Sequence, residues 1–582
     1  MVITRPRYFL ALPLAAILVL ASCAPAAAPA PAPQAPAVAQ PTAPAPRAPA
    51  PAQPTAAPAR PAATPAPAPA AAAPAQPAEQ PQAGGTLVSW ISGEPSTLDP
   101  HQETSFIGIQ MATPPRSTLM QWDSNEPADQ KIIPDLAEKW DSSGDGLTWT
   151  FTLRKGVKFH DGQPVTSADV KFSFERIMSP PEGITTPWKI LWTGVKSVEA
   201  PDPNTVRVTL SQPKPLFAKL VTWYYSGILP KHIVEKDPQS ATSKPVGSGP
   251  WVFGEWRKGV SIEFKKNKDY YRQGRPYMDS MKFLVIRDAT TAFAAMRTHQ
   301  VTIAGLGTLG ITKSQADTLK QQEPKMQVWR YDCGCMGRLV FNTQRKPFDD
   351  ERVRRAAALV VDTQKVIDLG YEGVGRKGGF MAPGPWSVPD AELTEKWPPF
   401  RGPTDKDIEA AKKILADAGY GGGIKATFLQ ATLARYEEQQ IAITSQLRKI
   451  GIESTIRVLN YPATFFDAGR RGDFDLMDMP TVSPIDDPDV YLSFYVTGNS
   501  ENYGKFSDKQ VDDLYARQSR EVDTVKRKDL AFQLQRRLME LAPAVVHLHR
   551  QYPGAAWPEL RGYKGPGKLY DNYKYEDVWL AR

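Results

Sequence analysis

Cys333 and Cys335 are separated by one residue, Gly334, in the segment RYDCGCMGRLVFN. Two thiols at this spacing could form a disulfide bridge or hold a metal ion. In an extended strand both thiols would point to the same face, with their Cα atoms about 6.6 Å apart. That distance is near the upper limit for a disulfide, so a bridge would need a local turn at Gly334. Two free, partly buried thiols fit the extended geometry best, and a bridge or a metal site remain alternatives.

His547 and His549 alternate with apolar residues in VVHLH, and such a pair on one strand face could bind a metal ion. The same alternation more simply places the histidines on a wet face and the valines and leucine inside. We therefore expect no metal site and no cofactor.

Motifs of catalysis are missing from the sequence. It contains no G-x-S-x-G, no H-E-x-x-H, no Cys–His signature and no G-x-x-x-x-G-K-[ST]. A secreted hydrolase or a nucleotide-driven enzyme is therefore disfavoured, and we expect no catalytic residue and no enzymatic activity.

The N-terminus is typical of an export signal with a lipid anchor. Arg5 and Arg7 precede an apolar run that ends in Leu20-Ala21-Ser22-Cys23, which resembles the bacterial lipobox. Residues 1–22 are then the signal peptide, and Cys23 carries the lipid. Residues 23–84 are rich in proline and alanine and predict an unfolded tether, or a cell-wall spacer. This places the protein outside the cytoplasm, anchored in a membrane, in the periplasm or on the outer face of the cytoplasmic membrane.

The composition of the remaining chain is that of a large folded body. The formal net charge is +8, and the charges are scattered without a basic run, so nucleic acid is not an expected partner. The 14 Trp and 20 Tyr residues could form the walls of a ligand cleft. We expect a monomer.

Local patterns predict a mixed α/β body. Apolar residues alternate over 147–153 after the turn Asp145-Gly146, and Thr166 with Asp169 forms a variant capping box that opens a helix. A helical stripe follows Phe348, comprising Val353, Ala356, Ala357 and Val360. Thr404 is the expected N-cap of the next helix, and residues 424–459 predict a β-α-β unit.

The ordered phrases of the chain resemble family 5 of the extracytoplasmic solute-binding proteins of ABC importers, the peptide and nickel binders. The phrases are LAEKWDSSGDGLTWTFTLRKGVKFHDGQPVTSADVKFSFERI at 136–177, GSGPWVF at 247–253, FNTQRKPFDDERVRRAAALVVDTQKVI at 341–367, DIEAAKKILADAGY at 407–420 and DDPDVYLSF at 486–494. The resemblance covers essentially all of residues 85–582.

The resemblance implies a two-lobed α/β fold of the periplasmic-binding-protein type (class II, cluster C), with hinge strands between the lobes. The first lobe would span 85–332 and be completed by 548–582, and the second lobe would span 333–547. The ligand would lie in the cleft between them.

Candidate ligand-binding residues of the first lobe follow from the family phrases. Trp223, Tyr224 and Tyr225 precede a proline–lysine–histidine phrase, and Trp223 is the one we expect in the cleft. Gly249 in GSGPW could let the backbone approach a ligand closely, or serve as a plain structural turn.

Candidates of the second lobe lie in two loops and near the cysteines. Met381 and Trp386 belong to the glycine–proline loop GGFMAPGPW, where Trp386 could close over a ligand. Arg330 and Arg338 flank the cysteine pair and could hold a carboxylate. Ser483 belongs to the segment MPTVSPIDDPDV.

One departure bears on the ligand. Peptide binders of this family usually hold the peptide ammonium with an aspartate shortly before the phrase DPD, and here Pro484 takes that position. Asp486 and Asp478 are near enough in sequence to substitute. A buried ammonium without a counter-charge is costly, so the change weakens the case for ordinary dipeptides.

The sequence therefore predicts a lipid-anchored binding protein that captures a peptide or a similar small organic solute and delivers it to a permease with its ATPase. Alternative ligands are an oligosaccharide, an opine, an aromatic acid or a metal chelate. A sensor or chaperone built on the same fold is an alternative role.

Overall fold

The alternating segment at 147–153 forms strand β5 (Thr148–Leu153) of an antiparallel sheet. The sheet has the order β4 (Ala137–Ser142), β5, β7 (Thr205–Leu210) and β6 (Val195–Asp202). Helix α2 (Ser167–Met178) begins with the predicted capping box of Thr166 and Asp169, and it packs on β6 and β7. The predicted strand and helix are thus confirmed.

A computed structural model describes residues 79–103, 105–124, 131–304, 310–432, 436–461, 463–483, 485–565 and 574–582. Residues 78–582 form one compact unit. The signal peptide, Cys23, most of the tether and Pro484 lie outside the described residues.

A second sheet follows the order β1 (Thr86–Ile91), β10 (Ser280–Val285), β9 (Ser261–Lys266) and β8 (Trp251–Arg257). β1 and β10 are parallel, whereas the other neighbours are antiparallel. Short pairs join β2 (Met120–Trp122) to β3 (Ile132–Pro134), and β18 (Leu560–Arg561) to β19 (Trp579–Leu580). The other helices up to residue 322 are α1 (Phe106–Ala112), α3 (Phe217–Leu220), α4 (Lys231–Val234), α5 (Ala289–Arg297) and α6 (Lys313–Gln322), with the 3-10 turns η1 (Pro187–Trp192), η2 (Tyr224–Ser226) and η3 (Ser240–Thr242).

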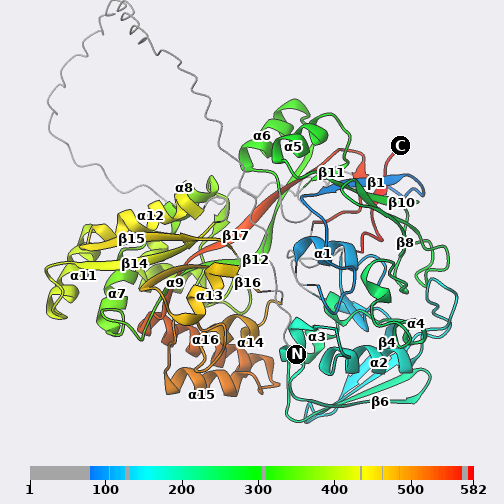
Figure 1. Ribbon diagram of the computed structural model, residues 1–582, viewed down its shortest axis with the longest axis horizontal. Helices are drawn as coiled ribbons and strands as arrows, with labels where there is room; N and C mark the ends of the chain where they lie inside the picture. The colour runs from blue at the N-terminus through cyan, green and yellow to red at the C-terminus, as the bar shows by residue number, and fades with distance from the viewer. Residues whose placement is uncertain are drawn as a thin grey trace, which may run out of the picture. The chain divides into compact units, whose positions relative to one another are not determined.

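Two long antiparallel strands, β12 (Gln327–Phe341) and β17 (Ala544–Ala556), form the middle of the largest sheet. Its order is β11 (Ile303–Ala304), β17, β12, β16 (Leu476–Val482), β14 (Ile424–Ala431) and β15 (Ile452–Leu459), and β13 (Gly375–Arg376) also pairs with β17. In Figure 1 β12 and β17 run from the region of β14 and β15 toward β11 and β1.

The predicted β-α-β unit consists of β14, α12 (Tyr436–Arg448) and the parallel strand β15. The predicted stripe is buried on α7 (Glu351–Val360), and Thr404 caps α11 (Asp405–Asp417). The remaining helices are α8 (Thr363–Tyr371), α9 (Asp390–Lys396), α10 (Pro398–Arg401), α13 (Ala463–Arg471), α14 (Pro488–Tyr491), α15 (Lys509–Gln518) and α16 (Thr524–Leu541), with the 3-10 turn η4 (Leu492–Tyr495).

We call the elements β1 to β10 with β18 and β19 the first lobe, and the elements α7 to α16 with β14 to β16 the second lobe. Each has its own buried core, and β12 and β17 contact both. Ile485 and Val490 of the second lobe belong to the buried cluster of the first. This is the two-lobed mixed α/β fold that the sequence predicts.

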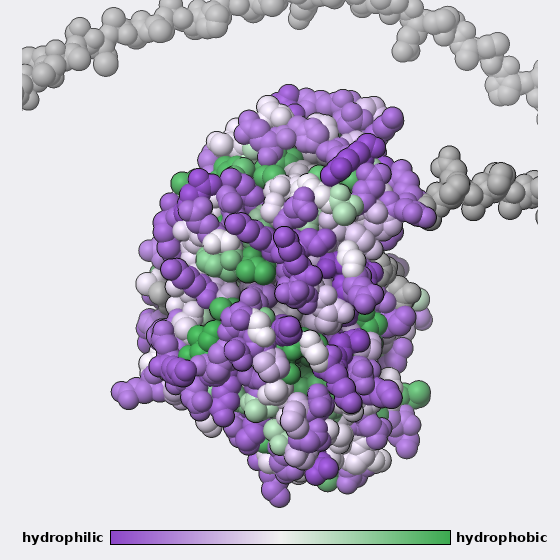
Figure 2. Space-filling model, turned by 90° about the vertical axis from the view of Figure 1, so that its right-hand side faces the viewer, coloured by the Kyte–Doolittle hydropathy of each residue, from purple (hydrophilic) through white to green (hydrophobic). Residues whose placement is uncertain are grey.

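The molecular face in Figure 2 is mostly hydrophilic, and hydrophobic residues appear on it as small separate patches. Within the described ranges, no helix combines the length and the apolar character needed to cross a bilayer.

Candidate functional site

The aromatic triplet of the first lobe follows α3 and is buried: Trp223 caps η2, and Tyr224 and Tyr225 are its first two residues. Trp223 is 2% exposed, and its ring packs against Trp188 at 5.0 Å and Tyr224 at 4.9 Å between centroids. The Tyr225 hydroxyl accepts a hydrogen bond from the Trp188 backbone N–H (3.3 Å), and burial raises the pKa of Tyr225 far above its usual range. All three rings therefore belong to the first-lobe core, in the cluster that Ile485 and Val490 join.

Lys219, at the end of α3, connects this region to the second lobe. Its Nζ donates to the backbone carbonyl of Asp486 (2.5 Å) and lies 3.1 Å from Asp487 Oδ2. The same Nζ lies 5.5 Å from the centre of the Trp386 ring. One side chain of the first lobe thus contacts two segments of the second.

Arg527 completes this group from α16. Its guanidinium donates to both carboxylate oxygens of Asp487, at 3.0 and 2.5 Å, and lies 5.1 Å from the Trp386 ring centre. We call Lys219, Trp386, Asp486, Asp487 and Arg527 the interlobe cluster.

The charges of the interlobe cluster set the pKa values of its acids. Burial by itself raises the pKa of Asp487, but Lys219 and Arg527 outweigh it and hold the value at about 2. Asp489 follows at the start of α14, and burial together with Asp487 raises its pKa. Asp487 is therefore an ionised carboxylate held between two cations.

The two loop candidates of the second lobe differ in exposure. Trp386 is partly exposed, and its backbone carbonyl accepts a hydrogen bond from Gln535 (2.8 Å). Met381 is fully buried in the second-lobe core. Of the two, Trp386 is the one that lies where the lobes meet.

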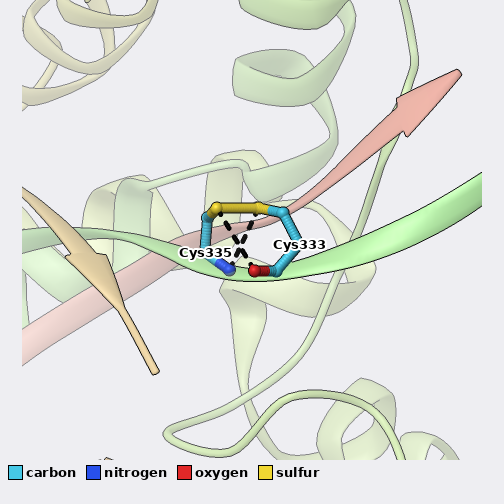
Figure 3. The surroundings of a disulfide bond; sticks show 2 residues. All are labelled: Cys333 and Cys335. Atoms are coloured by element: carbon cyan, nitrogen blue, oxygen red, sulfur yellow. Dashed lines mark hydrogen bonds between the residues drawn. A yellow bond between two sulfur atoms is a disulfide. The ribbon is translucent and has the colours of Figure 1, made fainter. Parts of the chain in front are cut away.

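Cys333 and Cys335 form a disulfide, so the alternative with two free thiols is not the one found (Figure 3). Gly334 between them has φ +65°, the local turn that a bridge requires, and this brings the Cα atoms to 5.0 Å. The backbone N–H of Ser483 donates to the Gly334 carbonyl (2.8 Å), and the Ser483 hydroxyl donates to Ile485 (2.7 Å). The disulfide thus supports the segment that leads to Asp486.

Arg338 and Arg330 lie in different surroundings. Arg338 is 2% exposed, donates to Thr481 (2.8 Å) and stacks over the rings of Phe494 and Tyr495. Arg330 is exposed on β12, where an ion pair with a carboxylate contributes little.

Gly249 makes its close approach to the chain itself. A Cβ atom at this position would lie 2.6 Å from backbone atoms of Pro114 and Arg116, and the Gly249 carbonyl accepts from Asn267 (3.0 Å). This close packing against the backbone of Pro114 and Arg116 accounts for the glycine.

Two cavities are lined by residues near the candidate segments 223–225 and 378–386. A cavity of about 50 Å³ in the first lobe is lined by Tyr224, Thr222 and Arg116 among others. A larger one of about 520 Å³ lies in the second lobe, between Trp397, Phe380 and Leu359, among other residues.

The prediction of a wet histidine face on β17 is wrong. His547 and His549 are both buried, because β17 is an inner strand covered on both faces. His547 Nε2 hydrogen-bonds Asp478 (3.0 Å), which also accepts from Gln439, and His549 bonds the carbonyl of Gly379 (2.9 Å). Among the described residues no cluster of acids, histidines and cysteines could hold a metal ion. Asp478 is committed to this core network.

Sequence reasoning missed Lys219 and Arg527. Lys219 lies in the short segment PKPLFAKL and Arg527 in TVKRKDLAF, which carry no motif. The only available signal was the acidic phrase DDPD, which implies cations elsewhere in the fold.

A model of the family "Bacterial extracellular solute-binding proteins, family 5 Middle" matches residues 131–503. Di/tripeptide-binding protein 1 of Pseudomonas aeruginosa is 27% identical over 504 residues, covering 81% of this chain and 90% of the relative. Heme-binding protein A of Haemophilus influenzae is 28% identical over 473 residues, covering 76% and 83%.

Solved structures show the same fold. The binding protein AgaA of A. tumefaciens R10 in complex with agropinic acid is 29% identical, with a TM-score of 0.68 over 86% of this chain and 99% of that one. The binding protein DppA of Helicobacter pylori in complex with the peptide STSA is 26% identical, with a TM-score of 0.71 over the same shares. Proteins of this kind bind solutes and are not enzymes. The chain belongs to family 5 of the bacterial extracellular solute-binding proteins.

Proposed function

We propose that this protein is the substrate-binding lipoprotein of an ABC importer, capturing a peptide or a similar small organic solute between its lobes. The observation that carries the proposal is the interlobe cluster, in which Lys219 of the first lobe meets Asp487 and Trp386 of the second. A charged side chain of the first lobe meets charged and aromatic side chains of the second there, a combination suited to enclosing a polar solute. Closure would present both lobes to the permease, and the ATPase would drive release.

The lobes of this proposal are residues 85–332 with 548–582, and residues 333–547. β12 and β17 serve as the hinge strands in this proposal, because their side chains join the buried clusters of both lobes. Trp386 and Asp486, which contact Lys219 of the first lobe, are the preferred ligand contacts of this proposal, and Trp223 and Ser483 are kept beside them. Tyr224, Tyr225, Gly249, Arg330, Arg338 and Met381 are kept as secondary candidates.

The lipid anchor at Cys23 and the tether up to residue 84 form part of the same proposal and rest on the sequence. An intact-mass measurement of the detergent-extracted chain tests it. The wild type is expected to carry a diacylglycerol adduct on a chain that begins at Cys23, and Cys23→Ala is expected to lack both.

A non-peptide solute is the second candidate. It is favoured by the likeness to AgaA, whose structure holds agropinic acid, and by the protein's own cation at Asp486 and Asp487. A peptide is favoured by the relatives whose names state peptide binding.

The test is to purify the full chain, desalt it, denature it and identify the released small molecules by mass spectrometry. Release of a series of short peptides would support a peptide as the solute. Release of a single organic compound would support a non-peptide solute. No released solute, together with no thermal stabilisation by any peptide, sugar or organic acid offered, would contradict the proposed function.

A further inference from the structure

The interlobe cluster and its neighbours balance their own charges. Three carboxylates lie there in one short segment: Asp486, Asp487 and Asp489. Three cations face them from other elements, Lys219, Arg527 and Lys214, and Lys214 and Arg527 both act on Asp489. Counted over these six described side chains, the charges are equal in number, so the group has no excess negative charge for a bound cation.

Lys219 makes the contacts that a ligand ammonium would make. Its Nζ donates to a backbone carbonyl, that of Asp486, and pairs with a carboxylate, that of Asp487. It also lies beside the aromatic face of Trp386, a contact that favours cations. These are the acceptors that a compact ammonium group seeks.

The carboxylates of Asp487 and Asp489 already accept hydrogen bonds from other side chains of the second lobe. Both carboxylate oxygens of Asp487 accept from Arg527, and one oxygen of Asp489 accepts from Gln518 and Ser519, both at 2.6 Å. Asp486 is 7% exposed, and its Oδ2 lies 3.8 Å from the position that a Cβ atom on Gly384 would take. A second ammonium at the Asp487 carboxylate would therefore lie beside the positive charges of Lys219 and Arg527.

We propose that Lys219 occupies the position of a ligand ammonium, so that the cleft selects solutes without a free amino group at this end. The ligand class would be N-blocked peptides and neutral or acidic organic compounds. The inference rests on the proposed function and narrows it. Lys219 acts as a specificity-determining residue, because its charge repels a free amine in the closed state.

Its test compares one peptide in three forms: trialanine with a free amino group, N-acetyl-trialanine and N-succinyl-trialanine. The dissociation constants are measured by calorimetry on the full chain after it has been unfolded and refolded to remove any bound solute. The variant is Lys219→Met, and the matched control is Lys231→Met, which removes a half-exposed lysine on α4. If Lys219→Met does not fold, Lys219→Gln keeps a donor toward Asp486 without the charge.

The wild type and Lys231→Met are expected to bind a blocked form at least tenfold more tightly than free trialanine. Lys219→Met is expected to reduce that ratio at least fivefold by gaining affinity for the free amine. A wild type that prefers the free amine, or a ratio that Lys219→Met leaves unchanged, would overturn the inference while leaving the proposed function in place.

If no form of trialanine binds, the inference is tested on the solute that denaturation releases from the purified wild type, identified by mass spectrometry. A released solute with a free amino group overturns the inference, and one without it supports it. If nothing is released and nothing binds, the proposed function fails, and the inference fails with it.

Discussion

Lys219 and Asp487 form an ion pair between the two lobes, with Nζ 3.1 Å from Oδ2. The carboxylate is fully buried, whereas the lysine side chain keeps 18% exposure. Because Arg527 binds the same carboxylate from within the second lobe, Asp487 would keep one partner if the lobes separated as proposed. The contact with Lys219 could then form and break with the proposed closure at a modest cost in free energy.

Asp487→Asn should destabilise the protein strongly. The change leaves the buried Arg527 with only the more distant Asp489 (3.5 Å) as counter-charge, a loss of about 3 kcal/mol in the free energy of unfolding. Denaturant unfolding measures it. Asp467→Asn, in an exposed pair with Arg471, serves as the control and should cost less than about 0.5 kcal/mol. Equal effects of the two changes would argue against a central role for Asp487.

Acid should destabilise the fold through His101. Burial, reinforced by Arg176, lowers the pKa of His101 to about 3, whereas an unfolded histidine titrates near 6.5. Between these values only the unfolded chain binds the proton. The free energy of unfolding therefore falls as the pH falls below 6.5, by up to about 1.4 kcal/mol per pH unit for this group.

Denaturant unfolding at pH 7, 6 and 5 tests this prediction. His101→Gln should lower stability at pH 7, because the imidazole bonds both Gly227 (3.0 Å) and Arg176 (3.0 Å), but it should flatten the decline toward pH 5. His299→Gln, at an exposed histidine, should leave the slope as it is. An unaltered slope in His101→Gln would refute the assignment.

The disulfide should be present in the purified protein. In a Cys23→Ala chain the remaining cysteines are Cys333 and Cys335. Alkylation of the denatured chain should label neither without reductant and both after reduction. The Cys333→Ser, Cys335→Ser double variant should lose about 1–2 kcal/mol of stability, because the closed loop is very short. Two labelled thiols without reductant would mean that the bridge does not form.

Gly249→Ala should act on the fold and not on the ligand. Its methyl group would lie 2.6 Å from backbone atoms of Pro114 and Arg116, so a loss of about 2 kcal/mol or more is expected in denaturant unfolding. Gly144→Ala, at an open position, is the control and should change stability little. A Gly249→Ala protein with unchanged stability and weakened solute binding would assign the glycine to the ligand.

Local sequence patterns predicted helices and strands well where the buried residues repeat with the regular spacing of one helix face or one strand face. The stripe on α7, the capping boxes at Thr166 and Thr404 and the β14–α12–β15 unit depend on neighbours in the chain. The expectation of a two-lobed fold came from the resemblance to the family, because no single local pattern specifies it.

The interlobe cluster could not be predicted in the same way. Lys219 and Asp487 are far apart in sequence, and their pairing depends on how the lobes meet. The prediction that His547 and His549 lie on a solvent-exposed face was wrong for a related reason. Alternation along a strand does not tell whether an inner strand such as β17 has a solvent-exposed face. The cysteine pair was misjudged because the turn at Gly334 departs from regular strand geometry.

The pairing of β12 with β17 has a consequence for biogenesis. Gln327 pairs with Ala556, so the middle of the largest sheet forms only after the strand at 544–556 has been made. During synthesis or export from the N-terminus, one long edge of β12 stays open, and such an edge invites aggregation. Closing so long a loop is also slow. A holding chaperone would therefore be needed most while β12 awaits β17, and mutations in β17 should reduce yield before they affect binding.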